Sequence, residues 1–568
     1  MAANASKAEK TLGIILMWVF LMLEYNKRPV ILNASSHDAK GRNSETGPPG
    51  APLPSSNRQK QTSIITTINL WLERGIVFWI FAIAVFAPHS IAATQIAWLC
   101  GMLFWVMRFI FRPRPLLFRT PVDYALFGFF IFTGLSAFLS YEPAVSVGKL
   151  RAASLFTIVY LVAENIPSAR IVRALALVLV ASSMINVLYT FGERAVGRGV
   201  KVTGVSQASP LFAAGIRDGD TLLEVDGQKL SNPEQLAAAL EMPSGNAAPP
   251  ARVKIYRYEW MPIFTVARGN LLPGKTALEQ LGMARWSRGR DWRAMGFYGH
   301  YVTYAEALQL IISLALGLFI CLPRKRSLNG LLLAIAVAGL GIALLLTVTR
   351  ATWLAFLVSA FIMLLLGASR RAILIVSACA LPLILGGLFV LHQKRNVGFF
   401  DQKDDSIRWR QTVQREGLHL LLSKPRHLLI GVGMDSIKKH WRQWGLFDNG
   451  RLPMGHMHSN LLQLALERGV PALLLWLVLL FIYARMLWRT FLRLGRSIYG
   501  APENTEDPGQ WIDRGILLGA LGGLAGFFTS GLVHYNWGDS EVVMIFYFIM
   551  GLSLVVERQS RLGLQKAT

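Results

Sequence analysis

Long apolar stretches separated by short basic connections constrain the fold of this sequence more than any other feature. Many of them run for about 18 or more residues with almost no charged side chain. An α-helix rises about 1.5 Å per residue, so a stretch of this length crosses about 30 Å of hydrocarbon. Amphipathic core helices would show polar residues every third or fourth position, and these stretches do not. We therefore expect an all-α polytopic membrane protein.

The pattern predicts about twelve membrane spans. They cover residues 69–88, 91–110, 122–139, 144–164, 171–191, 299–321, 329–348, 352–367, 372–392, 470–487, 513–533 and 541–557. A shorter apolar stretch at 11–24 follows a basic start, and a thirteenth span, an interfacial helix and a signal-like segment are all open there. Residues 26–62 are rich in Ser, Asn, Gly and Pro, which indicates a flexible linker.

Charged residues between the spans predict the orientation of the chain. Alternate connections carry basic clusters, as cytoplasmic loops do, and the connections between them are poor in Lys and Arg. The clusters are Arg112, Arg114 and Arg119; Arg324, Lys325 and Arg326; Arg370 and Arg371; and Arg485, Arg489, Arg493 and Arg496. This alternation places the linker and the C-terminus in the cytoplasm, and residues 192–298 and 393–469 on the outer side.

The predicted organisation has seven parts. They are an N-terminal segment and linker (1–63), a first membrane half (64–191), a small soluble insert (197–268), a second membrane segment (269–392), a large outer loop (393–469), C-terminal membrane helices (470–557) and a cytoplasmic tail (558–568).

The net charge of +25 does not indicate nucleic-acid binding, because most of the basic residues flank membrane helices. The loop at 393–457 is an exception, with 12 Lys and Arg against 6 Asp and Glu on the outer side. A net charge of +6 there favours an anionic ligand such as a lipid pyrophosphate, or attraction to anionic head groups. The cysteines Cys100, Cys321 and Cys379 have neither disulfide nor metal-ligand spacing.

The soluble insert at 197–268 resembles a bacterial PDZ domain, a small α+β fold. The motifs that carry the resemblance are Val202-Thr-Gly-Val205, Ser209-Pro210, Ala214-Gly215-Ile216, Gly219-Asp220 and the turn Asp226-Gly227. Ser231 to Glu234 is interpreted as a capping box that opens a short helix. The resemblance implies that a peptide or protein partner adds along one sheet edge, with Gly197, Gly199 and Val200 forming the carboxylate loop. Arg198 departs from the usual apolar loop, and a pure packing role is the alternative.

Two outward-facing basic residues are the first candidates for chemistry. Arg350 lies between two spans in Thr347-Val-Thr-Arg350, where an arginine either snorkels or binds an anion. His458 begins a helix predicted to lie along the membrane surface, and Asn460 follows it. A histidine can act as a general base near neutral pH, or it can have a structural role at a helix start.

Further candidates lie in the outer loop and at span ends. Paired arginines such as Arg408 and Arg410 suit phosphate oxygens, although an Asp–Arg surface cluster is the alternative. The turn at Gly431 and Gly433 is weak evidence for phosphate binding. Three polar groups of the membrane part complete the set: His300 where a span opens, Glu306 inside that span, and Asp539 at the outer end of the last pair of spans. Glu306 and Asp539 could equally cap or pair structurally.

Taken in order, these pieces resemble the bacterial O-antigen ligase and O-antigen polymerase superfamily. The matching features are Gly296-Phe-Tyr-Gly-His300, Arg350-Ala-Thr-Trp-Leu354, Asp405-Ser-Ile-Arg408, Gly431-Val-Gly433 and His458-Ser-Asn460 with Leu462, Glu467 and Gly469. The PDZ-like insert is not a usual feature of such ligases.

The resemblance implies an inverting, metal-independent glycosyltransferase of the GT-C type in the bacterial inner membrane, with its active face in the periplasm. The donor would be a glycan on undecaprenyl pyrophosphate, and no cofactor would be needed. His458 would be the general base, and Arg350 and Arg408 would stabilise the leaving pyrophosphate. Arg410, His300, Asn460, Gly431, Gly433 and Asp539 would contact substrate.

The sequence leaves the acceptor open. Lipid A–core would make the protein an O-antigen ligase of lipopolysaccharide biosynthesis, which is our expectation. A second lipid-linked repeat would make it a polymerase, and a protein hydroxyl an O-linked oligosaccharyltransferase. A transporter or an envelope scaffold would explain the membrane helices without catalysis, although charged residues deep in several spans, which a transporter predicts, are rare in this sequence.

Overall fold

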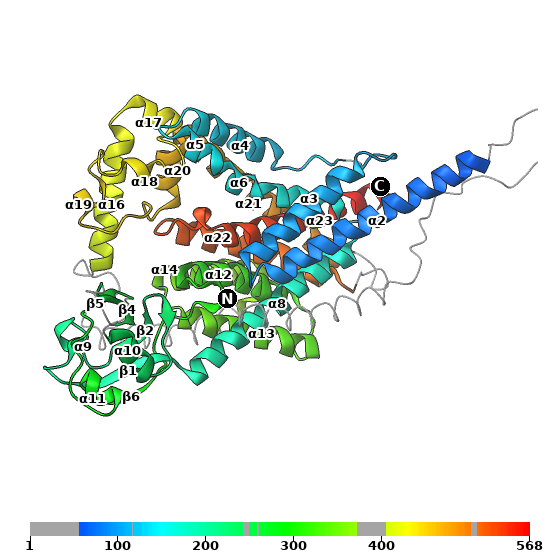
Figure 1. The fold of residues 1–568 in the computed structure, drawn as a ribbon. Helices are drawn as coiled ribbons and strands as arrows, with labels where there is room; N and C mark the ends of the chain where they lie inside the picture. The colour runs from blue at the N-terminus through cyan, green and yellow to red at the C-terminus, as the bar shows by residue number, and fades with distance from the viewer. Residues whose placement is uncertain are drawn as a thin grey trace, which may run out of the picture. The chain divides into compact units, whose positions relative to one another are not determined.

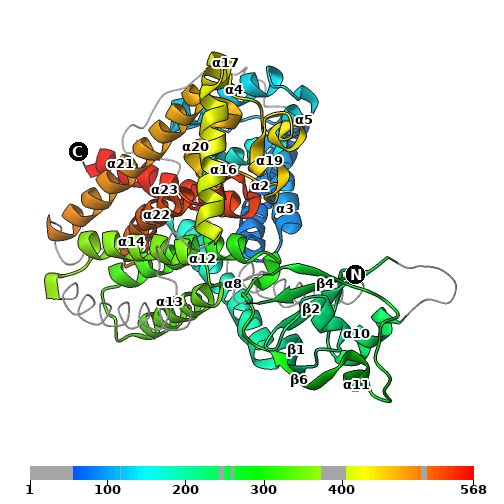
Figure 2. The same ribbon diagram turned by 90° about the vertical axis from the view of Figure 1, so that its left-hand side faces the viewer.

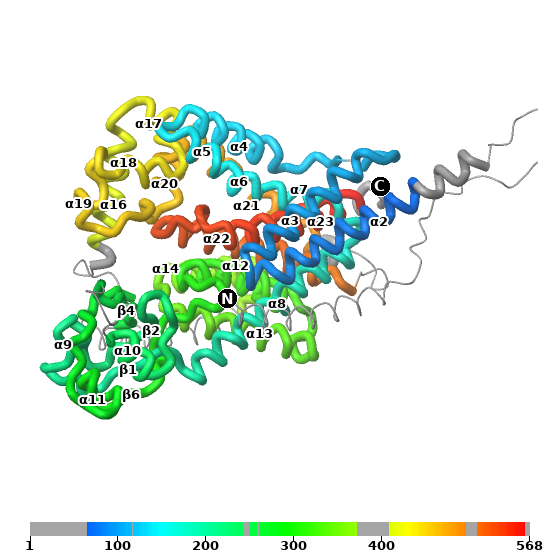
Figure 3. The backbone as a smooth tube through the Cα atoms, viewed as in Figure 1, coloured from blue at the N-terminus to red at the C-terminus, as the bar shows by residue number. Residues whose placement is uncertain are grey.

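The computed structural model describes residues 56–115, 117–241, 249–257, 261–371, 405–500 and 508–567. The chain divides into two units, Met1–Ser63 and Ile64–Thr568, and every element after the first turns of α2 belongs to the second. The predicted segment 11–24 and the span at 372–392 lie outside the described residues, as does Cys379. Figure 1 shows the ribbon with its element labels, and Figure 3 follows the same backbone as a tube.

Helices make up most of the second unit, as the apolar pattern predicts. The helices outside the insert and the outer loop are α2 (Ser56–Phe86), α3 (Ile91–Arg108), α4 (Asp123–Phe138), α5 (Pro143–Gly148), α6 (Leu150–Ala153), η1 (Ser154–Phe156), α7 (Thr157–Asn165), α8 (Ala169–Val196), η2 (Gly296–Tyr298), α12 (Tyr301–Cys321), α13 (Leu328–Leu346), α14 (Arg350–Gly367), α21 (Val470–Gly500), α22 (Gln510–Gly531), η3 (Asn536–Gly538) and α23 (Ser540–Ala567).

Ten helical segments of the described part of the chain are long and apolar enough to cross a membrane. They correspond to ten of the predicted spans, which confirms a multi-pass membrane protein. The predicted span at 122–139 forms α4, which has only 16 residues and is short for a crossing. The predicted span at 144–164 is broken into α5, α6, η1 and α7. The predicted linker ends early, because its residues from Ser56 onward belong to α2.

The centre of the membrane part is the contact between α12 and α22, the most extensive between any two elements (Figures 1 and 2). Glycines on both helices make this contact close. A Cβ on Gly317 would lie 2.4 Å from the Gly519 nitrogen, and one on Gly519 would lie 2.6 Å from Leu314 Cα. Small residues let helix backbones approach in this way. The pair aligns the start of α12 with the end of α22, where polar side chains gather.

The outer loop forms its own set of helices above these ends: α16 (Asp405–Leu422), α17 (Pro425–Ile430), α18 (Ile437–His440), α19 (Leu446–Gly450) and α20 (Asn460–Arg468). They pack around a separate apolar core that includes Val413, Val432, Phe447, Met457 and Leu466. Ser459 caps α20 with its side chain, so the predicted helix after His458 is confirmed. This core places α16 beside α20.

The insert is a six-stranded sheet with short helices. Its strands are β1 (Arg198–Val205), β2 (Thr221–Val225), β3 (Gln228–Lys229), β4 (Ala251–Tyr256), β5 (Ile263–Val266) and β6 (Met283–Gly289), in the order β5-β4-β2-β1-β6 with β3 on β2. The helices are α9 (Pro210–Ala213), α10 (Pro233–Leu240) and α11 (Ala277–Leu281). All pairings are antiparallel.

Two details of the insert differ from the prediction. The sheet reaches Gly289, past the predicted end at 268, because β6 pairs along β1. Helix α10 is capped by Asn232, whose side chain accepts from the Gln235 N–H at 3.0 Å. Gln235 Oε1 accepts from the Ser231 N–H at 2.8 Å, so the cap is Asn232 and the predicted box from Ser231 to Glu234 does not form.

Candidate active site

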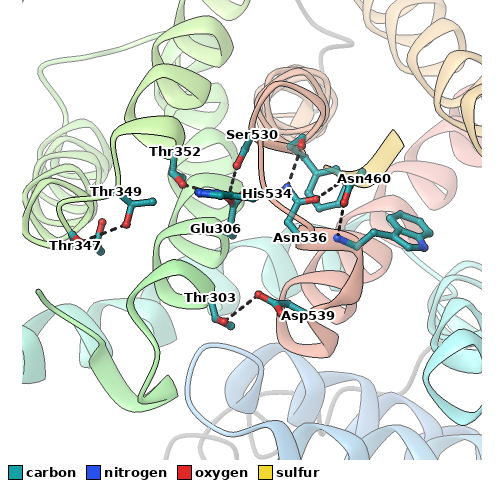
Figure 4. Close-up of polar contacts among 12 residues, drawn as sticks. Thr303, Glu306, Thr347, Thr349, Thr352, Asn460, Ser530, His534, Asn536 and Asp539 are labelled. Carbon is teal, nitrogen blue, oxygen red and sulfur yellow. Dashed lines mark hydrogen bonds and ion pairs between the residues drawn. The ribbon is translucent and has the colours of Figure 1, made fainter. Parts of the chain in front are cut away.

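Polar side chains from five segments gather at one end of the central helices, where α12 and α14 begin and α22 ends. They come from the start of α12, the start of α14, helix α16, the turn before α20 and the turn between α22 and α23. Each segment begins or ends a helix, so backbone geometry at helix ends fixes where these side chains lie. Figure 4 shows the part of this group that is joined by hydrogen bonds.

Glu306 on α12 is the hub of the network. Its side chain is fully buried, and its Oε1 atom lies 2.9 Å from His534 Nδ1 and accepts from Thr352 Oγ1 at 3.2 Å. The Ser530 hydroxyl also donates to this oxygen, and Asn536 Nδ2 donates to Oε2 at 3.2 Å (Figure 4). A buried carboxylate is costly unless it is bonded in this way. Glu306 therefore ties α12, α14, α22 and the turn before α23 together.

Asn460, the first residue of α20, joins the outer loop to this network. Its Nδ2 atom donates to Asn536 Oδ1 at 2.6 Å, and its Oδ1 atom accepts from the Trp537 N–H at 3.1 Å (Figure 4). Asn460 is 1% exposed, so these bonds use its amide inside the protein. The structure gives this predicted substrate contact an anchoring role.

His300 and Asp539, both predicted contacts, are joined through Thr303. His300 Nδ1 lies 3.1 Å from Thr303 Oγ1, and that hydroxyl donates to Asp539 Oδ2 at 3.0 Å. Burial raises the pKa of the Asp539 carboxyl to about 7. Burial lowers the pKa of His300, and the nearby charges of His534, Arg293 and Lys254 lower it further.

His458 has a strained backbone and a buried ring. Its φ of 48° lies in the left-handed region, which non-glycine residues adopt mostly at special sites. Its ring lies edge-on to Trp409 at 4.4 Å and 4.1 Å from the ring of His456, and Gln414 Nε2 donates to its carbonyl oxygen at 3.1 Å. Helix α16 therefore holds this turn in place.

Burial lowers the pKa of His458 to about 2, and the charges of His456, Arg410 and His534 act in the same direction. Burial likewise lowers the pKa of His456 to about 4, with contributions from His534, His300, Lys438 and Arg410. The imidazoles of His300, His456, His458 and His534 thus act on one another and share one region of the protein. Both motif histidines are neutral there at pH 7.

The cations of the region come from three segments. Arg410 on α16 acts on His456 and His458. Arg293 precedes α12, and its pKa is lowered by burial and by the charge of Arg350. Arg293 Nη2 donates to the Val348 carbonyl at 2.7 Å, beside the start of α14. Arg408 is exposed on α16. Side chains two positions apart on an α-helix point about 200° apart, so Arg408 faces away from Arg410.

Sequence reasoning did not select Arg293 or His534. Arg293 follows β6 in a connector that the insert fixes in place: Trp292 is buried, and the guanidinium groups of Arg194 and Arg198 lie 5.8 and 5.6 Å from its ring. His534 lies between two spans, and the charge-poor connection His534–Ser540 was its only signal in the sequence.

The predicted phosphate turn has a packing role. The Gly431, Val432 and Gly433 N–H groups donate to the carbonyls of His427, Leu466 and Glu467. A Cβ on Gly431 would lie 2.5 Å from the Glu467 carbonyl. Because these amides are engaged and the backbones are in contact, this turn seats α17 against α20 and does not present its N–H groups to a phosphate.

The predicted carboxylate loop of the insert is occupied in a similar way. Gly197 N–H donates to the Glu193 carbonyl at 2.9 Å, and Gly199 and Val200 lie within β1. Strand β1 pairs with β2 on one side and with β6 on the other. A peptide cannot add to a strand whose two edges are paired, so these three residues do not form the expected binding edge.

The described residues contain no group of three or more His, Cys, Asp or Glu side chains arranged to hold a metal ion.

Fold and site together define a multi-pass membrane protein with a buried histidine- and arginine-rich site at the ends of its helices. Residues 334–477, about a quarter of the chain, match the family described as O-antigen ligase. The matched stretch includes Arg350, Arg408, Arg410, His458 and Asn460. Over this stretch the chain is similar to O-antigen ligases, a membrane glycosyltransferase-like family.

Two curated proteins are similar over a short stretch. The chain is 48% identical over 52 residues to the magnetosome formation protease MamE of Magnetospirillum gryphiswaldense, and 45% identical over 53 residues to that of Paramagnetospirillum magneticum. Each stretch is 9% of this chain and 7% of the relative. The chain thus covers less than a tenth of the length of these relatives.

Proposed function

We propose that the protein transfers a glycan from undecaprenyl pyrophosphate to an acceptor hydroxyl at the periplasmic face of the inner membrane. The acceptor that we propose is lipid A–core, because residues 334–477 match the family described as O-antigen ligase. The observation that carries the proposal is the convergence of Arg293, Arg350, Arg410 and the histidines from separate segments, within and beside the stretch that matches O-antigen ligase.

The chemistry suits such a site. A glycosyl pyrophosphate already has a good leaving group, so its departure needs cations placed where negative charge develops. Arginine guanidinium groups contact phosphate oxygens through two hydrogen bonds and keep their charge when partly buried. Direct displacement by the acceptor hydroxyl would invert the anomeric carbon, with neither a nucleotide sugar nor a metal.

The residues take the following roles in the proposal. Arg350 and Arg410 bind the pyrophosphate. Arg408, which is exposed to solvent on α16, contacts the donor as it arrives. His458 contacts the reacting groups as a neutral imidazole. His300 and Asp539 line the acceptor side through Thr303. Asn460 holds the outer loop on this site.

The insert is proposed as a PDZ-like module that faces the periplasm. Its sheet, with α10 and α11 beside it, supports this reading. A partner peptide would add to β5 or β6, since each pairs with a single neighbour in the described sheet, rather than to β1. The proposal therefore retains the peptide partner that the PDZ resemblance implies, but Gly197, Gly199 and Val200 are not its binding residues.

Glycan transfer by the purified protein tests the proposal. Undecaprenyl-pyrophosphate oligosaccharide is offered with lipid A–core, as lipid-linked repeat alone, or with candidate periplasmic proteins. A product on lipid A–core that is lost in Arg350→Gln supports ligation. A product on another acceptor assigns the polymerase or protein-modifying reaction. A folded protein that gives no product with any acceptor refutes the proposal in favour of a transporter or scaffold.

A further inference from the structure

Glu306 and His534 form a buried carboxylate–imidazole pair that the proposed roles above do not use. His534 Nδ1 lies 2.9 Å from Glu306 Oε1. The side chain of His534 is 6% exposed and that of Glu306 is 0% exposed. The carboxylate accepts other bonds from Thr352, Ser530 and Asn536, so its position is fixed from several helices (Figure 4).

This contact sets the tautomer of His534. A carboxylate accepts hydrogen bonds, so Nδ1 carries the proton and Nε2 has a free electron pair. The pairing also stabilises the ring when Nε2 takes up a second proton, because an imidazolium beside a carboxylate is an ion pair. The same arrangement, a base held by a third group, recurs in sites that activate a hydroxyl.

His534 lies in the same region as the residues of the family match. A positive charge on His534 would disfavour protonation of His300, His456 and His458, which come from three positions in the sequence, so the four rings share one region. A proton accepted at His534 therefore stays within the site where the pyrophosphate departs.

His458 has the opposite surroundings. Burial disfavours the charged form of its ring most strongly, and a positive charge on His456, Arg410 or His534 would oppose its protonation further. A ring in such a place binds as a neutral group and is a weak proton acceptor. The two histidines are therefore suited to different tasks.

We propose that His534 Nε2, oriented by Glu306, accepts the proton of the attacking hydroxyl. The inference rests on the proposed function and names the proton acceptor of that same site. The acceptor oxygen forms a bond to the anomeric carbon, the bond from that carbon to the pyrophosphate oxygen breaks, and its electron pair leaves with the pyrophosphate. The hydroxyl proton moves to Nε2, giving an imidazolium paired with Glu306.

The decisive variant is His534→Asn. Its amide nitrogen occupies about the position of Nδ1 and still donates to Glu306, while the accepting Nε2 atom is gone. We expect its thermal unfolding and its binding of undecaprenyl-pyrophosphate oligosaccharide to match those of the native protein, and its transfer rate to lipid A–core to fall about 100-fold or more. His458→Asn is the matched control, because asparagine tolerates a positive φ. We expect it to weaken donor binding.

A second pair of variants, His534→Ala and His458→Ala, is assayed with added imidazole. Rescue of the first and not of the second supports His534 as the proton acceptor, since a structural role is not restored by free imidazole. A glycan transfer rate in His534→Asn equal to that of the native protein overturns the inference and leaves the proposed function intact. The same holds if imidazole restores transfer only in His458→Ala. If the native protein transfers no glycan, the proposed function fails first. If His534→Asn does not fold, imidazole rescue of His534→Ala decides alone, and its absence counts against the inference.

Discussion

The close contact of α12 and α22 makes a quantitative prediction for Gly519→Ala. The added Cβ would lie 2.6 Å from Leu314 Cα and 2.8 Å from the Ser313 carbonyl oxygen. Carbon atoms in contact are separated by about 3.5 Å or more, so the two helices must move apart by about 1 Å. Overpacking of this kind costs about 1–3 kcal/mol.

Gly192→Ala is the matched control for this substitution. Gly192 is also helical, on α8, and no atom lies within 4 Å of the position of its Cβ. Alanine there adds only its helix propensity, worth up to about 1 kcal/mol in favour of the fold. Gly519 is helical as well and gains the same propensity, so that gain cancels and the two variants should differ by the overpacking cost, about 1–3 kcal/mol, although the chemical change is identical.

Thermal unfolding of detergent-solubilised protein, followed by tryptophan fluorescence, measures this difference. We expect Gly519→Ala to unfold several degrees below the native protein and Gly192→Ala at or above it. Glycan transfer should fall in Gly519→Ala as well, because the α12–α22 contact holds Glu306 against Ser530. Equal unfolding temperatures for the two variants would refute the close approach of these helices.

Three further predictions concern the site and its support. Because the folded-state pKa of Asp539 is raised from 3.8 to about 7, the native protein should lose stability as pH rises from 4 to 7 through this group; Asp539→Asn should lack that loss when unfolding temperatures at pH 5 and pH 8 are compared. Gly431→Ala, at a φ of 73° and with a carbonyl 2.5 Å from the new Cβ, should expose the loop helices to limited proteolysis, whereas Gly455→Ala, which meets no neighbour within 4 Å, should not. Arg293→Gln should weaken donor binding about tenfold in a titration with undecaprenyl-pyrophosphate oligosaccharide, while Arg285→Gln, exposed on β6, should leave it unchanged.

The sequence predicts the membrane helices well because the signal is local. A span is a run of apolar residues, and its length and composition are read directly from the chain. Two details of the helices do not follow from a count of apolar residues. Helix α4 has only 16 residues, and the stretch from Pro143, although apolar enough to span, is divided into four pieces. The insert shows the limit of local reading, since its motifs predict β1 and β2 but not β6.

The site depends on contacts between distant residues, and that is where prediction from sequence is weakest. Arg350 and His458 could be selected because each stands in a recognisable local pattern. The hydrogen bond between Glu306 and His534 joins residues 228 positions apart, and the local sequence around each residue does not predict it. The prediction of a phosphate-binding turn at Gly431 and Gly433 was wrong for the same reason. The Gly433 N–H donates to the carbonyl of Glu467 on α20, which is distant in the sequence. A residue's type suggests what it can do, and its surroundings in the fold decide which of those tasks it performs. His534 lies beside the Glu306 carboxylate, whereas burial, with His456 and Arg410 nearby, disfavours protonation of His458.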